Sequence, residues 1–240
     1  MFKTRNTKLE RIDTGDYTPD EYATFLREIR FINRYLGDTR ALRKSLFREI
    51  ENEGVREFSV LDVACGSGEL LRETEKFARQ TERTAHLTGI DLHELSFSAN
   101  GASPPNVSYV RGDAFRLPFP DGAFDYAISS LFFHHLRDEQ IPPVLSEMAR
   151  VTRRGVFIID LHRHPAAYYL YKLFCFVFRI SPLVAQDGAL SVLKGFRPAE
   201  MREFANEGTA RTNRVAPFRI VTRFSGVGDL RLDKHLEKGQ

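Results

Sequence analysis

A glycine-containing turn after an apolar segment is where the sequence first indicates chemistry. Val60-Leu61-Asp62-Val63 leads directly into Ala64-Cys65-Gly66-Ser67-Gly68. Gly66 and Gly68 carry no Cβ, so the backbone can take positive φ angles there and pass close beneath a ligand. Asp62 can accept hydrogen bonds from the turn itself or, through water, from an amino group of the ligand. We predict a small-molecule binding turn at residues 62–68, which we call the glycine turn.

A glycine turn alone does not identify a ligand, because many α/β proteins use one for phosphates or dinucleotides. This one lacks the third glycine of the Gly-x-Gly-x-x-Gly pattern, which disfavours a dinucleotide. Two further carboxylates, Asp91 and Asp113, each follow a short apolar segment. Asp91 could accept hydrogen bonds from both hydroxyls of a ribose, and Asp113 could accept one from an adenine amino group.

Each of the three aspartates also has a purely structural interpretation. Asp62 could cap a strand end, Asp91 could cap a helix N-terminus, and Asp113 could form a turn. Their succession after neighbouring apolar segments favours a shared ligand over three separate structural roles.

The order and spacing of four segments carry a family resemblance. The segments are 60–71, 89–92, 111–114 and 117–136, the last of which ends in Phe133-His134-His135-Leu136. Together they resemble the class I S-adenosylmethionine-dependent methyltransferases, especially the ubiquinone/menaquinone-methyltransferase-like branch. The resemblance covers about residues 58–161.

This resemblance implies S-adenosylmethionine as the cofactor. Its methionine part would lie at the glycine turn, its ribose at Asp91 and its adenine near Asp113, while the backbone of Ser129 would face the methionine amino group. The implied cofactor-binding residues are Asp62, Ala64, Cys65, Gly66, Gly68, Asp91, Leu92, Asp113, Ala114 and Ser129.

Four histidines follow predicted strand ends, where α/β sheets bind ligands. They are His134, His135, His162 and His164. Methyl transfer from a sulfonium mainly requires positioning of the acceptor, but a phenol, enol or acidic carbon also needs a base. We take His134 or His135 as the candidate base. The alternative is that His-His-Leu only anchors the following loop.

Two further expectations concern these histidines. Asp160 could orient His162 or His164, or could simply end its strand. No carboxylate or thiol cluster in the sequence completes a ligand set with the histidines, so no metal site is predicted.

Between residues 58 and 161, short apolar segments alternate with helix-like ones, which is typical of repeated βα units. The resemblance implies an α/β fold with a Rossmann-like, seven-stranded, mostly parallel sheet and helices on both faces. We predict strands at 58–63, 84–91, 106–111, 123–129 and 155–161, a closing strand or hairpin at 215–224, and helices at 68–80, 93–100 and 138–151.

Helical segments flank this sheet. We predict an N-terminal helical lid segment at 1–54, with helices at 18–36 and 39–52, and a methyltransferase domain at 55–240. A capping box at Thr18-Pro19-Asp20-Glu21 starts the first helix. A helical insertion at about 165–207 would hold helices at 165–180 and 198–206, with 187–191 and 195–198 as loop and helix start. Residues 1–11 are interpreted as a solvated end, Arg153-Arg154 as a turn and 232–240 as a polar tail.

The insertion is rich in aromatic side chains between Tyr168 and Phe178, nearly all round its helix. Such a helix is buried in a core, in a lid or against a lipid-like substrate. The second and third interpretations predict a small hydrophobic acceptor, phenolic, quinone or polyketide-like.

Composition narrows the partners and the compartment. The chain of 240 residues has a formal net charge of +3 and no basic run, so no nucleic-acid partner is expected. Two cysteines suggest no disulfide framework, and the N-terminus has no apolar signal segment, so we expect a cytoplasmic protein. The apolar run 173–178 is far shorter than the roughly 18–20 residues of a membrane span, which leaves only peripheral contact open. Monomer and homodimer both fit.

We therefore expect a methyltransferase that moves a methyl group from S-adenosylmethionine to oxygen or carbon of a small hydrophobic acceptor. One alternative is a methyltransferase of a macromolecule, which the missing basic patch disfavours. Another is a protein that binds S-adenosylmethionine without methylating.

Overall fold

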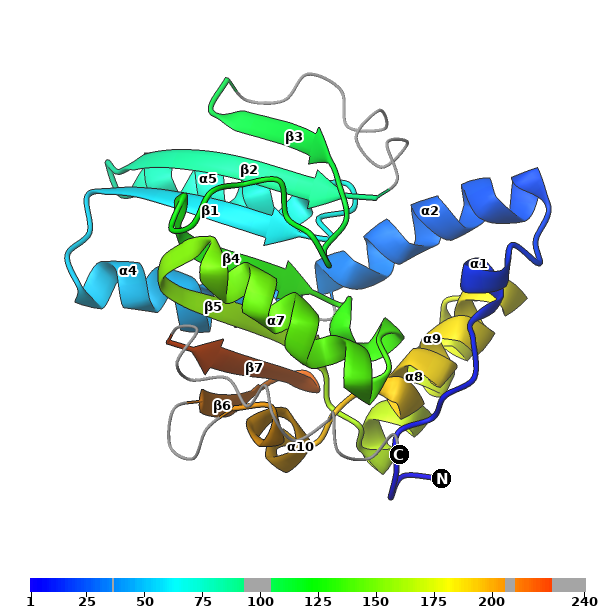
Figure 1. The fold of residues 1–240 in the computed structure, drawn as a ribbon. Helices are drawn as coiled ribbons and strands as arrows, with labels where there is room; N and C mark the ends of the chain where they lie inside the picture. Colours follow the sequence, from blue (N-terminus) through cyan, green and yellow to red (C-terminus); the bar gives the residue numbers. More distant parts are fainter. Residues whose placement is uncertain (36, 93–104, 206–209, 226–240) are drawn as a thin grey trace.

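Seven strands form one twisted sheet in the order β3-β2-β1-β4-β5-β7-β6 (Figure 1). The computed structural model describes residues 1–35, 37–92, 105–205 and 210–225. The strands are β1 (Glu57–Val63), β2 (Thr84–Asp91), β3 (Val107–Arg111), β4 (Phe124–Ser130), β5 (Thr152–Leu161), β6 (Ala210–Val215) and β7 (Arg219–Phe224). Strands β1 to β5 pair in parallel, whereas β7 is antiparallel to both β5 and β6. The predicted α/β fold with a mostly parallel, seven-stranded sheet is confirmed.

Successive side chains of the central strands point to opposite faces of the sheet and pack into two apolar cores, one on each face. Leu61 of β1 packs with α7 (Ile141–Arg150) and α10 (Pro198–Glu203). Its neighbour Val60 points the other way, toward α5 (Glu69–Gln80) and the helical run 38–52. Helices on both faces therefore hold the carboxyl ends of the strands in fixed positions.

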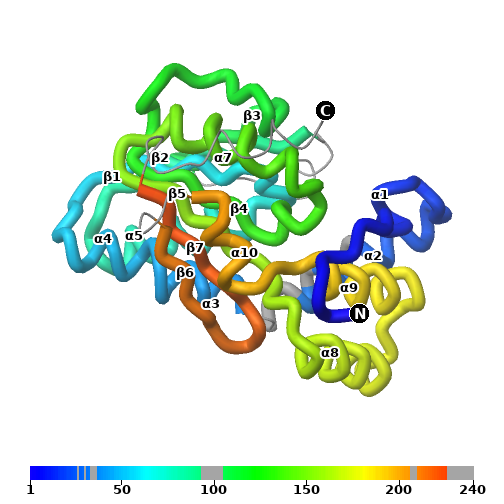
Figure 2. The backbone as a smooth tube through the Cα atoms, turned by 60° about the horizontal axis from the view of Figure 1, so that its bottom comes forward, coloured from blue at the N-terminus to red at the C-terminus, as the bar shows by residue number. Residues whose placement is uncertain are grey.

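Helices α1 (Arg11–Thr14), α2 (Pro19–Tyr35), α8 (Pro165–Val177) and α9 (Pro182–Lys194) gather beyond the carboxyl ends of the parallel strands (Figures 1 and 2). A third apolar cluster, including Ile32, Tyr171 and Val184, holds α2, α8 and α9 together. In open α/β sheets, ligands bind beyond these strand ends. The four helices thus cover the edge where the sequence places its site.

The predicted capping box of α2 is present. The Glu21 amide donates to Thr18 Oγ1 at 3.2 Å, and the Thr18 amide donates to Glu21 Oε2 at 2.8 Å. The second predicted helix consists of α3 (Asp38–Leu42), the π-helical η1 (Arg43–Phe47) and α4 (Arg48–Asn52). The predicted helix at 93–100, the end of the first helix at Leu36 and the polar tail at 232–240 lie outside the described residues.

Residues 187–191 are helical, so their prediction as a loop was wrong. They belong to α9, which begins at Pro182 with Ser181 as its N-cap residue. Gly188 and Asp187 are typical loop residues, but here each has a tertiary role. A Cβ on Gly188 would lie 2.0 Å from Tyr171 Oη, so the glycine allows α8 to pack closely on α9.

Residues 1–11 are not the solvated end that the sequence suggested. Arg5 donates to the carbonyl oxygens of Lys194 and Leu136, both at 2.9 Å, and its guanidinium lies 4.1 Å from the centre of the Phe196 ring. Glu10 is only 3% exposed. Side-chain contacts with residues far along the chain hold this segment, and its local sequence does not reveal them.

Arg153 and Arg154 were wrongly interpreted as a turn, because β5 already begins at Thr152. Both side chains are exposed and paired with acids, Arg153 with Asp125 at 3.2 Å and Arg154 with Glu53 at 3.0 Å. These ion pairs accommodate two consecutive arginines at the start of β5. The sequence pattern indicates a strand only from the apolar residues that follow them. No helix among the described residues has the length and apolar character needed to cross a membrane.

Candidate functional site

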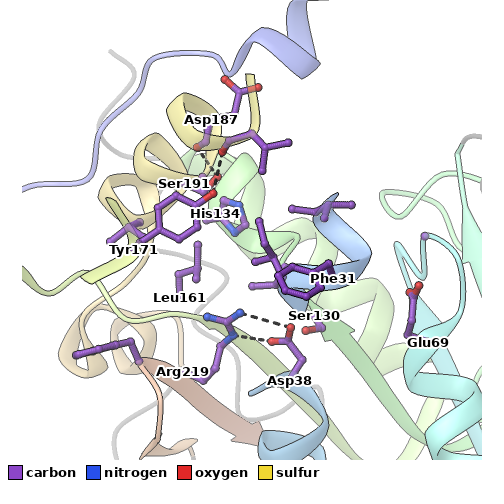
Figure 3. A pocket seen from close by; sticks show the side chains of 18 of the residues that line it. Phe31, Asp38, Glu69, Ser130, His134, Leu161, Tyr171, Asp187, Ser191 and Arg219 are labelled. Carbon is purple, nitrogen blue, oxygen red and sulfur yellow. Dashed lines mark hydrogen bonds and ion pairs between the residues drawn. The ribbon is translucent and has the colours of Figure 1, made fainter. Parts of the chain in front are cut away.

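A cavity of about 1320 Å³ lies between the carboxyl ends of β1, β4 and β5 and helices α2, α8 and α9 (Figure 3). Its lining includes Asp62 and residues 64–67 of the glycine turn, His134 and His135. On the other side it is lined by apolar residues of α2 and α8, among them Phe25 and Phe174. The glycine turn, two candidate bases and the aromatic insertion therefore share one space.

The two glycines of the turn serve different purposes. Gly66, at φ 52°, has open space where a Cβ would lie, so its conformation and not crowding calls for glycine. Gly68, at φ 71°, has the Tyr109 hydroxyl 2.1 Å from the position of a Cβ. Ala64 also has a positive φ of 58°. Gly66 thus shapes the wall of the cavity, and Gly68 packs behind it.

Asp62 is 2% exposed, and its carboxylate lines the cavity. Burial raises its pKa well above the usual value, and the charges of Glu69 and Asp91 raise it further. No group of the described residues donates a hydrogen bond to this carboxylate. A buried acceptor of this kind is suited to a cationic or hydrogen-bonding ligand group.

Asp91 is the last residue of β2, and Asp113 follows the paired strand β3 at the same end of the sheet. The Gly66 amide donates to Asp91 Oδ2 at 2.9 Å, so Asp91 also orders the glycine turn. Asp113 Oδ1 accepts from the Phe115 amide at 2.9 Å, which makes it a turn former. The structure brings these carboxylates next to the turn, but neither belongs to the cavity lining, and nor do Leu92 and Ala114.

Neighbouring serines at the end of β4 differ in their contacts. Ser129 is fully buried, and its hydroxyl donates to the Val63 carbonyl at 2.8 Å, so it ties β4 to β1. Ser130 lines the cavity, and its buried hydroxyl has no hydrogen-bond partner within the described chain. Sequence reasoning named Ser129 and missed Ser130. Beside Asp62, the Ser130 hydroxyl is a second polar group suited to an amino acid moiety such as the methionine part of S-adenosylmethionine.

His134 is held by a carboxylate that the sequence assigned to other histidines. Its Nδ1 lies 2.8 Å from Asp160 Oδ1, and its backbone amide donates to Asp160 Oδ2 at 3.1 Å. Burial lowers the pKa of His134, although Asp160 opposes that shift. Burial alone would raise the pKa of Asp160, but His134 holds it below its usual value. The pair keeps a neutral imidazole oriented beside the cavity, with Nε2 as its other nitrogen.

His135 has an acidic partner from the N-terminal segment. Its Nδ1 lies 3.3 Å from Asp13 Oδ2. Burial would lower the pKa of His135, but Asp13 and Glu10 together raise it. In return, and against burial, His135 and Lys194 lower the pKa of Asp13 to about 2. His135 is therefore the more readily protonated of the two histidines.

Glu10, His134 and His135 offer ligand atoms within 4.8 Å of one another, a spacing that could hold a metal ion. The sequence had indicated no carboxylate beside these histidines, so that expectation was wrong. However, Lys194 Nζ already lies 3.0 Å from Glu10 Oε1 and 3.6 Å from Asp13 Oδ2. An ammonium thus balances the carboxylates, and the group is best described as a buried ion-pair cluster.

The other two histidines have different surroundings. His162 lines the cavity, and burial together with Arg214 and His164 lowers its pKa to about 4. His164 is the N-cap of α8, where its Nδ1 accepts from the Ala166 amide at 3.2 Å. The structure therefore gives His164 a capping role and leaves His162 at the cavity wall.

An ion pair between Asp38 and Arg219 also lines the cavity, and sequence reasoning missed it (Figure 3). Arg219 Nε donates to Asp38 Oδ1 at 2.5 Å, and both residues are buried. The pair joins the start of α3 to β7. Its members are 181 positions apart, so no local pattern could have indicated it.

Comparisons with known proteins agree with this arrangement. Residues 60–155 match the family model described as a methyltransferase domain. A demethylmenaquinone methyltransferase of Staphylococcus aureus is 34% identical over 118 residues, which cover 48% of this chain and 47% of that protein. The chain thus spans about half the length of the curated relatives it matches.

Solved structures share the fold at low identity. The magnesium protoporphyrin IX methyltransferase of Synechocystis, solved with bound SAH, is 14% identical with a TM-score of 0.60, covering 90% of this chain and 100% of that one. A plantazolicin methyltransferase, also in complex with SAH, gives a TM-score of 0.62 at 14% identity, covering 87% and 91%. The matched residues 60–155 and the sheet order agree with a methyltransferase domain, and this part of the chain is similar to the class I S-adenosylmethionine-dependent methyltransferases.

Proposed function

We propose that the chain transfers a methyl group from S-adenosylmethionine to an oxygen or carbon atom of a small hydrophobic acceptor. The observation that carries this proposal is the single cavity of about 1320 Å³, which joins the glycine turn, His134 and the apolar faces of α2 and α8. The name of the Staphylococcus aureus relative supports a quinone-like or phenolic acceptor.

The cofactor would bind at the glycine-turn end of the cavity and extend beyond the cavity lining to the carboxyl ends of β2 and β3. Asp62 and Ser130 would bind the amino acid part of the cofactor, since both offer buried polar atoms without a partner among the described residues. The backbone at Ser129 and the turn residues 64–66 would lie beside it. Asp91 would bind the ribose, and Asp113 with Ala114 would bind the adenine, while Gly68 and Leu92 would support these contacts.

The acceptor would lie between His134 and the aromatic side chains of α2 and α8. When bound, S-adenosylmethionine would supply an electrophilic methyl group: the acceptor forms a bond to the methyl carbon, the bond from that carbon to sulfur breaks, and S-adenosylhomocysteine leaves as the neutral sulfide. His134 Nε2 would take the proton from the acceptor oxygen or carbon, while Asp160 holds Nδ1 and favours the resulting imidazolium. The helices exclude water from the acceptor side. His135, with its raised pKa, is less suited to act as the base.

The first prediction tests the cofactor. Asp62→Asn should weaken S-adenosylmethionine binding by about 1–3 kcal/mol, because the amide loses the charge that the cofactor's ammonium group would meet. The same change should leave the free protein as stable or make it more stable, since it removes a buried carboxylate with a raised pKa. Calorimetry and urea unfolding measure the two effects.

Asp20→Asn is the matched control, because Asp20 is exposed on α2. Unchanged affinity in Asp62→Asn would show that the amino group binds elsewhere. Calorimetry with NAD separates the cofactor classes: tight NAD binding without S-adenosylmethionine binding would overturn the proposed function as a whole.

A further inference from the structure

One face of α8 carries large apolar side chains that point to solvent. They follow one another at the spacing of a single helical stripe: Tyr169, Leu170, Leu173, Phe176 and Val177. Phe176 is 81% exposed, the largest value among the exposed apolar residues. The opposite face of α8 is already packed, with Tyr171 and Cys175 buried against α9. The stripe is therefore not needed to hold the helix in place.

Neighbouring segments enlarge this stripe. Phe178 directly after the helix is 54% exposed, and its ring is tilted against that of Phe31 of α2, with ring centroids 5.9 Å apart. At the other end, the N-terminus lies beside α8 and α9 (Figure 2), where the Phe2 ring lies 6.5 Å from that of Tyr169. Contiguous apolar surface of this kind on a water-soluble domain marks an interaction site. We call the stripe with Phe31, Phe178 and Phe2 the apolar patch.

Four exposed cations border the apolar patch. Lys172 and Arg179 lie on or directly after α8, and Lys3 and Lys8 belong to the adjoining N-terminal segment; all four are exposed. Lys8, Lys172 and Phe176 line one shallow pocket together, so cations and stripe share a surface. Within the described residues none of the four cations takes part in an ion pair. An apolar stripe bordered by free cations is typical of helices that bind anionic lipid surfaces.

We propose that α8 docks in the interface plane of a membrane that contains anionic lipids, with the apolar patch among the acyl chains and the four cations at the headgroups. The helix has 13 residues, about 20 Å in length, and lies along the surface of the protein. Its apolar side chains are thus presented side by side to a plane. A second copy of the chain fits this surface less well, because a twofold contact would bring Lys172 and Arg179 of both copies together.

The apolar patch adjoins the cavity, which suggests a route for the acceptor; this consequence rests on the proposed function. Leu170 belongs to the apolar patch and also lines the cavity. Phe174, which is not part of the patch, lines the cavity too. A lipid-soluble acceptor could therefore pass from the bilayer along α8 toward His134. Membrane docking itself needs no methyl transfer, so the two ideas can fail separately.

The test uses the absence of tryptophan from the sequence. Phe176→Trp introduces a single reporter at the centre of the apolar patch. Its emission should shift to shorter wavelength with vesicles of phosphatidylcholine and phosphatidylglycerol, and should not shift with phosphatidylcholine alone. Phe115→Trp is the matched control, since Phe115 is also an exposed phenylalanine but lies beyond β3, and its emission should stay unchanged.

Vesicle sedimentation then tests the wild-type chain. Leu173→Glu/Phe176→Glu should reduce the bound fraction at least tenfold, and Lys172→Glu/Arg179→Glu should do so at low salt, with unchanged circular dichroism in each case. Binding that ignores these substitutions, or an unshifted Phe176→Trp emission with anionic vesicles, would overturn the proposal. So would a dimer in light scattering that Phe176→Glu converts to a monomer while the wild type does not bind vesicles.

Discussion

Two buried polar groups at the cavity, the Asp62 carboxylate and the Ser130 hydroxyl, have no hydrogen-bond partner within the described chain. Such groups cost stability when they are left unpaired. His134, in contrast, is fully engaged on one side by Asp160 and faces the cavity with the other. At the scale of single residues, the cavity wall thus combines two polar groups that could bind a ligand, Asp62 and Ser130, with an imidazole that Asp160 holds in a fixed orientation.

The orientation of His134 leads to a prediction about pH. Asp160→Asn should lower turnover about 10²–10⁴-fold if His134 is the base, because the imidazolium loses its counter-charge. Burial already places the pKa of His134 below 6.5, and loss of Asp160 removes the group that opposes this shift. The acid limb of the pH–rate profile should therefore move to lower pH in the variant.

The stability of the protein should follow the same titration. A histidine whose pKa is lower in the folded chain than in the unfolded one leaves stability complete above pH 6.5 and reduces it as the pH falls through the folded value.

His134→Ala should abolish turnover of the true acceptor, while His135→Ala is the neighbouring control. Full turnover in both variants would show that neither His134 nor His135 is the base.

Residue-scale features were only partly accessible from the sequence. Asp62 and His134 could be named because strand ends meet at one edge of a parallel sheet. Glu10, Ser130 and the pair Asp38–Arg219 could not, since their burial depends on contacts between distant parts of the chain. A polar residue in an otherwise ordinary helix or loop gives no local sign of such a contact.

At the scale of elements, strands β1 to β5 and β7 were predictable because their alternating or continuous apolar residues reflect burial on the two faces of the sheet, whereas β6 (Ala210–Val215) lies before the closing strand or hairpin predicted at 215–224. Helix α9 was not, because Asp187 and Gly188 are residues that favour loops. Asp187 Oδ1 and Oδ2 accept from the amides of Arg11 and Ile12, and Gly188 lies against the Tyr171 ring. Tertiary packing thus outweighs local preference in this helix.

Gly188→Ala tests that balance. Alanine favours a helix over glycine by about 1 kcal/mol, whereas forcing a methyl group into a packed contact costs about 1–3 kcal/mol. A Cβ would lie 2.0 Å from Tyr171 Oη and 2.4 Å from Tyr171 Cζ, so the second effect should dominate. The free energy of unfolding in urea should fall.

Tyr171→Leu provides the control, because leucine does not reach the position of the ring atoms. Gly188→Ala should cost less in that background than in the wild type, and equal costs would show that the contact between α8 and α9 is not the reason for the glycine.

At the scale of the whole molecule, the N-terminal segment contacts elements that lie far from it in the sequence. Arg5 connects it to η2 (Phe133–His135) and to α9, Glu10 pairs with Lys194, and Asp38 pairs with Arg219. The predicted lid of residues 1–54 is thereby bound to both sides of the cavity. That this segment acts as a lid stays a prediction.

Arg5→Ala should lower the free energy of unfolding by about 1–3 kcal/mol, since it leaves carbonyl groups of residues 136 and 194 without their donor. Limited proteolysis should then cleave within residues 1–17 of the folded variant. Arg79→Ala is the matched control: this arginine side chain is 72% exposed and, among the described residues, forms an ion pair with Glu75 alone, so its loss should cost about 0.3–0.5 kcal/mol. Similar costs for both arginines would contradict the fixed position of the segment.

The length of chain between these partners bears on how the protein is made. Asp38 and Arg219 are 181 positions apart, and Glu10 and Lys194 are 184 apart. During synthesis, Asp38 and Glu10 can therefore find these partners only after more than 180 further residues have been made. We expect the sheet region to form before these pairs, so that Glu10 and Asp38 dock only after Lys194 and Arg219 have been synthesised, and the cavity acquires its final wall at that stage.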